Sequence, residues 1–132
     1  MKLFKKKSKK LKIYCDVDET LVMWENPNMP YCGNFELNEE LILQLRNGLD
    51  QNKYDVTIWS AGGKYWAQCI SNILFNEYNL KTYDKYNHWK KIKNNIYAID
   101  DRKQYERKYL SKFKKVYLPN SFIKYSNIYL NT

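Results

Sequence analysis

Acidic and hydroxyl side chains follow three apolar stretches of this sequence, each at the point where a buried strand would end. They are Asp16, Asp18, Ser60, Asp100 and Asp101. Four carboxylates in one crevice would repel one another, and a bound hard cation is the usual remedy. Because oxygen ligands without histidine or cysteine favour Mg²⁺ over zinc, the residue types predict a magnesium site.

Carboxylates beside such a cation suit the transfer of a phosphoryl group. The cation neutralises phosphate charge and orients the group for in-line attack. One carboxylate can attack phosphorus to form an aspartyl phosphate, and a second can protonate the leaving oxygen and later activate water. The Ser60 hydroxyl and a lysine can hold the non-bridging oxygens.

The elements that would position these side chains alternate along the chain. Apolar, β-prone runs predict strands at Leu11–Cys15, Tyr54–Trp59, Asn95–Ile99 and Lys115–Leu118. Helical patterns are expected over residues 36–49, 64–78, 84–93 and 102–112. This alternation predicts an α/β domain with a parallel sheet, whose binding crevice lies at the carboxyl ends of the strands.

Other segments have clearer local signals. Residues 24–34 hold two prolines and Gly33 and are predicted to form a loop. The helix over 36–49 carries leucines at one helical spacing, with Asn38 near its N-cap, and the next helix carries Trp66, Ile70, Ile73 and Leu74 on its apolar face. The tail from residue 120 shows no readable pattern.

Three of these stretches resemble motifs of the haloacid dehalogenase (HAD) superfamily phosphatases. Asp16-Val17-Asp18-Glu19-Thr20-Leu21 resembles their DxDxT motif, Thr57-Ile58-Trp59-Ser60-Ala61-Gly62 their second motif, and Tyr97-Ala98-Ile99-Asp100-Asp101 their fourth. The three occur in order and cover nearly the whole chain. The resemblance implies a HAD-like Rossmannoid fold, with a central parallel sheet and flanking helices, and a magnesium-dependent phosphatase activity.

The resemblance also implies a role for each acidic residue. Asp16 would be the nucleophile and a metal ligand. Asp18 would be the general acid and base, with its backbone carbonyl on the metal. Asp100 and Asp101 would complete the magnesium site, and Asp100 is the better candidate for direct contact.

Phosphate-binding groups form a second set. The resemblance implies that Ser60 and Ala61 bind phosphate and that Thr20 braces the motif loop beside them. The third motif of the family is a lysine before the last of these strands, and several lysines lie in that window. Lys85 is favoured because its spacing leaves room for a helix before the strand, and Lys90 is the alternative.

The segments in which larger HAD enzymes insert a cap domain are short in this chain. Residues 20–57 hold one loop and one helix, and residues 63–85 hold little more than another helix. Neither has room for a separate domain. We therefore expect a single domain over residues 11–132 with an open site, which suits the end or side chain of a macromolecule.

Two subfamily resemblances indicate different substrates. Residues 98–102, with His88-Trp89-Lys90 upstream, resemble the phosphatase half of phage-type polynucleotide kinase/phosphatase, which removes 3′-phosphates from nucleic-acid ends. Residues 16–22 resemble the DLDETLV signature of phosphatases that act on the RNA polymerase C-terminal domain. Nucleic-acid ends or nucleotides rank first and phosphoprotein second. A basic nucleic-acid-binding module on an inactive HAD frame is the third alternative.

The composition bounds the partners. The 132 residues carry a net charge of +9, which is typical of domains that meet nucleic acid or phosphorylated substrates. Residues 1–10 form a basic arm that is expected to be a frayed end or a nucleic-acid-binding or targeting segment.

The cysteines and the apolar runs bear on the cellular compartment. No apolar run is long enough to span a membrane, and three cysteines without a CxxC pair favour a reducing, cytoplasmic compartment. A viral or phage origin is conceivable.

Overall fold

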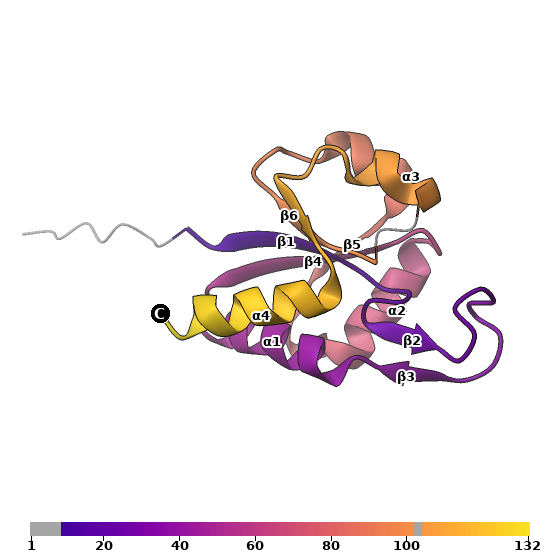
Figure 1. Ribbon diagram of the computed structural model, residues 1–132, viewed down its shortest axis with the longest axis horizontal. Coiled ribbons are helices and arrows are strands. Elements are labelled where there is room, and N and C mark those ends of the chain that lie inside the picture. The colour runs from indigo at the N-terminus through magenta and orange to yellow at the C-terminus, as the bar shows by residue number, and fades with distance from the viewer. Residues whose placement is uncertain (1–8, 102–103) are drawn as a thin grey trace, which may run out of the picture.

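The computed structural model describes residues 9–101 and 104–132, and its centre is a parallel sheet of five strands (Figure 1). The sheet has the order β5-β4-β1-β6-β7. These strands are β1 (Leu11–Asp16), β4 (Tyr54–Ser60), β5 (Lys81–Asp84), β6 (Tyr97–Ile99) and β7 (Lys115–Tyr117). The chain moves outward from β1 to β5 and then returns to β6, so the winding reverses between β1 and β6. The expected α/β class with a parallel sheet is confirmed, and the fold is Rossmann-like.

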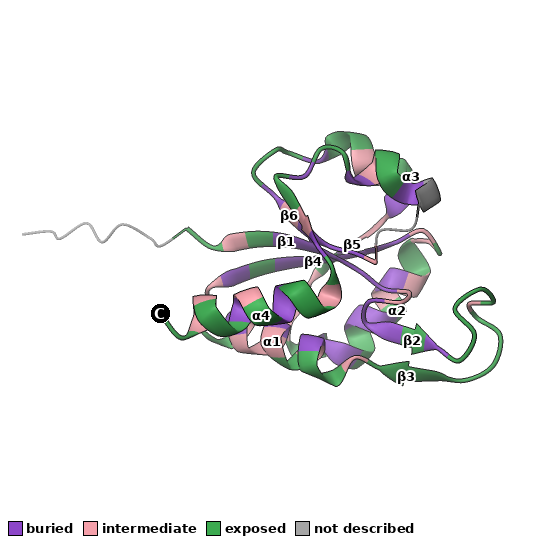
Figure 2. Cartoon of the chain, viewed as in Figure 1, coloured by how far each residue is buried: buried purple, intermediate pink, exposed green. Residues whose placement is uncertain are grey.

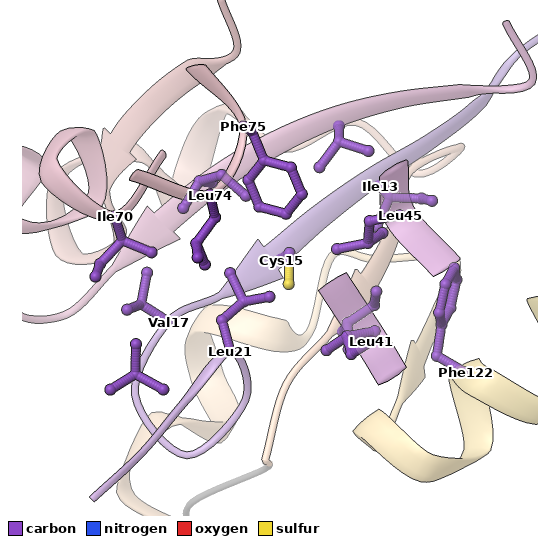
Figure 3. Close-up of a cluster of buried hydrophobic side chains, with 14 of the residues drawn as sticks. Ile13, Cys15, Val17, Leu21, Leu41, Leu45, Ile70, Leu74, Phe75 and Phe122 are labelled. Atoms are coloured by element: carbon purple, nitrogen blue, oxygen red, sulfur yellow. The ribbon is translucent and has the colours of Figure 1, made fainter. Parts of the chain in front are cut away.

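Three helices cover one face of the sheet (Figure 1). They are α1 (Glu39–Asp50), α2 (Lys64–Leu74) and α4 (Pro119–Leu130). Side chains alternate between the two faces of a strand, so Ile13 and Cys15 of β1 point toward these helices. They pack with Leu41, Leu45 and Phe122 in the larger core (Figure 3).

The other face of the sheet is covered by short helical segments. These are α3 (Lys85–His88), η2 (Trp89–Lys91) and η3 (Gln104–Leu110). A second core of Tyr14, Trp59, Ile92, Leu110 and Phe113 lies beneath them. The buried residues of β1 gather toward its carboxyl end, and Lys12 near its amino end is exposed (Figure 2).

An antiparallel hairpin lies beside the carboxyl end of β1. Its strands are β2 (Val22–Trp24) and β3 (Phe35–Leu37), and the expected loop connects them. The prediction of a helix over 36–49 is wrong at its start, because residues 35–37 pair with β2 and the helix begins at Glu39. The Asn38 cap is confirmed, since its side chain accepts a hydrogen bond from the Leu41 amide.

Several other boundaries differ from the sequence expectation. Strand β5 and helix α4 were not expected. Strand β5 has only four residues, and helix α4 is rich in aromatic and polar residues, so neither shows a clear apolar pattern. The expected helix over 64–78 ends at Leu74, where Phe75 leaves the helical conformation and η1 (Asn76–Tyr78) follows. The stretch 84–93 is helical only over residues 85–91, because Ile92 is extended.

The remaining expectations concern the last helix and the chain start. The helix expected over 102–112 is a 3₁₀ segment over Gln104–Leu110, and residues 102 and 103 lie outside the described residues. Of the basic arm, residues 1–8 also lie outside them, and Lys9 and Lys10 are exposed. No helix in the described part of the chain has the length and apolarity needed to cross a membrane.

Candidate active site

The carboxyl ends of the central strands bring the motif residues to one edge of the sheet. Asp16 is the last residue of β1 and Ser60 the last residue of β4. Because Cys15 pairs with Ile99, the next residues, Asp16 and Asp100, leave the sheet side by side. All three polar side chains are buried. The crevice expected at this edge, beside the point where the winding reverses, therefore holds them together.

Lys85 lies at the centre of this group. It follows β5 directly, where Asp84 caps α3 by accepting the Tyr86 amide. The buried Lys85 ammonium lies 3.1 Å from Asp16 Oδ1, 2.9 Å from Asp100 Oδ2 and 3.4 Å from Glu106 Oε1. The structure thus brings the favoured lysine, Lys85, into the site.

Lys90, the alternative lysine, lies outside this group. It is exposed on η2, and its ammonium lies 5.7 Å from the centre of the Trp89 ring. An exposed ammonium on an aromatic ring is weakly held, and the ion pairs with Asp16, Asp100 and Glu106 are made by Lys85. The spacing argument therefore selected the lysine that the fold places beside Asp16.

Burial and charge act in opposite directions on these groups. Burial on its own lowers the pKa of Lys85, but the carboxylates of Asp16, Asp100 and Glu106 together raise it above its ordinary value. Burial raises the pKa of Asp16 well above its usual range, and Lys85 offsets only part of that effect. Asp100, Asp101 and Glu106 raise the pKa of Asp16 further. Among the described residues, Lys85 therefore offsets only part of the effect of burial and of the neighbouring carboxylates on Asp16.

The donor set at this edge fits a hard divalent cation. Asp16, Asp100 and Asp101 each offer a carboxylate oxygen, and these atoms lie within 4.8 Å of one another. Only oxygen ligands are present in the group, as Mg²⁺ prefers. A divalent cation would also offset the mutual repulsion of these three carboxylates. The Asp18 side chain lies outside this group of ligands, and the role of its backbone carbonyl stays a prediction.

The Asp18 carboxylate is held by donors from three elements. Its Oδ1 accepts the indole N–H groups of Trp24, at 2.9 Å, and Trp66, at 3.1 Å. Its Oδ2 accepts the Tyr31 hydroxyl at 2.7 Å and lies 3.5 Å from Ser60 Oγ. The sequence placed Trp66 on the apolar face of a helix and gave no sign that these three aromatic residues fix the orientation of Asp18.

The turn after β1 is tied to both Asp16 and the hairpin. Thr20 Oγ1 donates to Asp16 Oδ2 at 3.1 Å, and Nδ2 of the Asn38 side chain donates to the Thr20 carbonyl at 3.0 Å. Glu19 has a φ of 60°, a conformation that glycine adopts more readily. Its carboxylate accepts the Trp24 amide, a bond that glycine at this position would lack. Thr20 therefore braces Asp16 from within the turn.

A cavity of about 200 Å³ opens onto this group. It is lined by Asp16, Asp18, Pro30, Tyr31, Ala61, Gly62, Tyr86 and Glu106. Ala61 lies where a phosphate-binding residue is expected. The Ser60 hydroxyl, at the start of the loop that follows β4, is buried and accepts a hydrogen bond from the Gly62 backbone N–H at 2.9 Å. The cavity thus joins the two DxD carboxylates to the loop after β4.

Sequence reasoning missed two residues of the site. Glu106 is buried in a short 3₁₀ segment beside basic Arg107 and Lys108, and no helical pattern marked it as facing inward. Tyr86 lines the cavity from α3, one position after Lys85. Its place follows from the helix start at Asp84, which the sequence expectation did locate.

Comparisons with known proteins add no assignment. No family model matches this chain, and no match was found among curated proteins or solved structures. The fold class rests on the strand order, and the chemistry rests on the side chains at the sheet edge.

Proposed function

We propose that this protein is a Mg²⁺-dependent phosphomonoester hydrolase of the HAD type that acts through an aspartyl phosphate on Asp16. One observation carries the proposal. The buried Lys85 ammonium bonds both Asp16 and Asp100, at the same cavity into which Asp18 faces. Phosphoryl transfer to an aspartate requires a carboxylate held in place, a fixed positive charge beside it and a second carboxylate on the same cavity. Asp16, the Lys85 ammonium and Asp18 are these three groups in the proposal.

Asp16 is the proposed nucleophile because both of its oxygens are held. Lys85 donates to Oδ1 and Thr20 donates to Oδ2, so the carboxylate has little freedom to rotate away from a bound phosphate. An Asp16 oxygen forms a bond to phosphorus while the bond from phosphorus to the ester oxygen breaks. The positive charge of Lys85 favours the ionised Asp16 that this step needs.

Asp18 is the proposed acid and base for the two half-reactions. It donates a proton to the ester oxygen as the alcohol leaves. It then accepts a proton from the water that attacks the aspartyl phosphate, which releases phosphate and restores Asp16. Trp24, Trp66 and Tyr31 hold the Asp18 carboxylate in one orientation for both steps.

Asp16, Asp100 and Asp101 are the residues that would hold Mg²⁺. When bound, the cation supplies positive charge that offsets the carboxylates and the phosphate oxygens. The loop at Ala61 and Gly62 lines the opposite side of the cavity and would contact the phosphate there. Glu106 holds Lys85 from below, so the ammonium stays between Asp16 and Asp100.

Nucleic-acid 3′-phosphate ends, or nucleotides, are the proposed substrates. The cavity of about 200 Å³ is smaller than a typical ligand pocket, so it would take the phosphate and leave the rest of the substrate outside. Tyr31 and Tyr86 line it with exposures of 51% and 45%, so aromatic side chains at the mouth could contact a base. The net charge of +9 also favours a polyanion.

Phosphate release from a 3′-phosphorylated oligonucleotide tests the proposal. We expect release with Mg²⁺, none with EDTA, and none from Asp16→Asn. Glu40→Gln is the control, because it removes an exposed carboxylate from α1 that lines neither this cavity nor the lysine-rich hollows of the sheet. Hydrolysis of a phosphoserine peptide but not of the oligonucleotide would move the substrate to phosphoprotein. An enzyme inert even on an aryl phosphate would contradict the hydrolase and favour the binding module.

A further inference from the structure

One half of a sheet face is left uncovered by the helical segments. Lys12 of β1 and Lys81 of β5 lie on the same face as the second core, but toward the amino ends of their strands. The register places Lys12 beside Asp55 and Lys81 beside Thr57. Both lysines are exposed, so their ammonium groups stand on an open surface at the end of the sheet remote from Asp16.

Two adjoining cavities lie along this surface. One of about 480 Å³ has Lys10, Lys12, Lys81 and Lys93 among its lining residues. The other, of about 550 Å³, has Lys9, Lys10, Lys12 and Lys114. Because Lys10 and Lys12 line both, the two hollows form one continuous basic surface, made of Lys9, Lys10, Lys12, Lys81, Lys93 and Lys114. We propose that this basic surface binds single-stranded nucleic acid through its phosphates.

The charge balance of the basic surface supports a polyanionic ligand. Asp55 is the one carboxylate among the residues that line the two cavities, against six ammonium groups. In the described part of the chain, none of these six lysines forms an ion pair with a carboxylate. Unpaired ammonium groups close together attract phosphates and release counterions when phosphates bind.

Aromatic side chains distinguish a nucleic-acid strand from a lipid surface. Tyr78 and Tyr83 line the first cavity and Tyr97 lines the second, and all three residues are half-buried. Rings between phosphate-binding lysines suit the stacking of unpaired bases. Binding to a membrane would need apolar side chains that insert, and the exposed large aliphatic residues line neither cavity.

The basic surface is separate from the proposed catalytic cavity. Along β1, Lys12 precedes Asp16 by four residues, which is roughly 13 Å of strand. The catalytic cavity is lined by the carboxylates of Asp16, Asp18 and Glu106 and cannot itself attract a polyanion without a cation. The inference therefore stands whether or not the site at Asp16 hydrolyses phosphate esters.

Fluorescence anisotropy of a labelled oligodeoxythymidine of about 20 nucleotides, long enough to cover a single-strand site, tests the inference. The strand carries no terminal phosphate and the buffer contains EDTA, so catalysis plays no part. The test variant is Lys10→Gln/Lys12→Gln/Lys81→Gln. The control variant is Lys64→Gln/Lys108→Gln/Lys124→Gln, which removes the same charge from exposed lysines that line neither cavity.

We expect the test variant to bind at least ~10-fold more weakly than the wild type at low salt. Its slope of log K against log salt should fall by about 2, since each single-strand phosphate contact contributes about 0.7. The control should stay within about threefold of the wild type. Equal losses in both variants, or no binding by the wild type, would overturn the proposal. The proposal would also be overturned if the wild type bound phosphatidylserine vesicles more tightly than the strand and the test variant lost that vesicle binding.

Discussion

Lys85 and Asp100 form a fully buried ion pair, with 2.9 Å between Nζ and Oδ2. The two residues lie at the carboxyl ends of β5 and β6, which are separated in the sheet by β4 and β1. The lysine therefore reaches across the strand ends, and Asp16 at the end of β1 lies on its path. Removal of this one cation would leave several carboxylates together in a buried space.

Lys85→Met is accordingly expected to destabilise the fold. Methionine keeps the unbranched shape but leaves Asp16, Asp100 and Glu106 without their common partner. Loss of one member of a buried ion pair costs about 3–5 kcal/mol, and urea unfolding in EDTA measures it. Lys90→Met, at an exposed lysine, should change the free energy of unfolding by less than about 0.5 kcal/mol. Similar values for the two variants would contradict the role assigned to Lys85.

Lys85 and Glu106 show what the sequence can and cannot locate. Strand ends follow from apolar runs, and a lysine before the last motif strand could be chosen because a helix needed room after it. Glu106 could not be chosen, since it lies in a short 3₁₀ segment where no helical stripe separates inward from outward side chains. Its role is set by contact with Lys85, which is distant in sequence.

Mg²⁺ should stabilise the wild type by binding at Asp16, Asp100 and Asp101. A ligand that binds only the folded state at 100 times its Kd adds about 2.7 kcal/mol. Thermal unfolding with and without Mg²⁺ gives the increment for each variant. Asp100→Asn should abolish it, whereas Asp55→Asn should retain it. An increment in Asp100→Asn as large as in the wild type would place the metal elsewhere.

The pKa of Asp16 predicts how the metal-free protein responds to pH. Burial raises this pKa in the folded state, so the folded protein binds the proton more tightly than the unfolded chain does. The resulting stability is present below the ordinary aspartate pKa and is lost as pH rises through the raised value. Asp16→Asn removes the titration and keeps an acceptor for Lys85. Relative to the wild type, the variant should therefore gain stability as pH rises.

Denaturant titrations in EDTA at a series of pH values measure that difference. Saturating Mg²⁺ is the internal control, because the cation favours the ionised Asp16 and should reverse the advantage of Asp16→Asn. Parallel stability curves for the two proteins in EDTA would show that the Asp16 carboxyl titrates alike in the folded and unfolded states.

The fold was more predictable on the central strands than at its margins. β1 and β4 are long, buried and rich in β-branched or aromatic residues, so their pattern is visible. The hairpin strands have three residues each, and β3 is exposed throughout, so no alternation marks it. Ile73 was expected on the buried face of its helix but is 67% exposed, because hydrophobic type alone does not fix which side meets the sheet.

Helix α4 did carry one local signal that the sequence expectation missed. Pro119 directly follows the strand predicted over Lys115–Leu118, and it is the first residue of the helix. Proline is favoured at that position because its missing N–H is not needed there. The helix then buries Phe122 and Ile123 beside α1, a pattern that the tyrosines and asparagines of the same helix obscure.

The hydrogen bond from Trp66 Nε1 to Asp18 Oδ1 gives a test of positioning. Trp66→Phe removes this donor and keeps an aromatic ring against Trp24, whose ring centre lies 6.0 Å away. Asp18 would then rotate about its remaining donors, and kcat should fall roughly 10-fold with little change in KM, since misorientation acts on the proton-transfer step. Steady-state kinetics on an aryl phosphate measure both constants.

Trp89→Phe is the matched control for this substitution. The Trp89 ring packs against Tyr109, 5.6 Å between centres, and its indole is not among the groups that donate to Asp18. It should keep kcat within about twofold of the wild type. A rise in KM alone for Trp66→Phe would mean that the indole contacts the substrate. Equal losses of kcat in both variants would mean that Trp66 acts through general packing and not through its hydrogen bond to Asp18. Trp24 and Tyr31 would then be the residues that position Asp18.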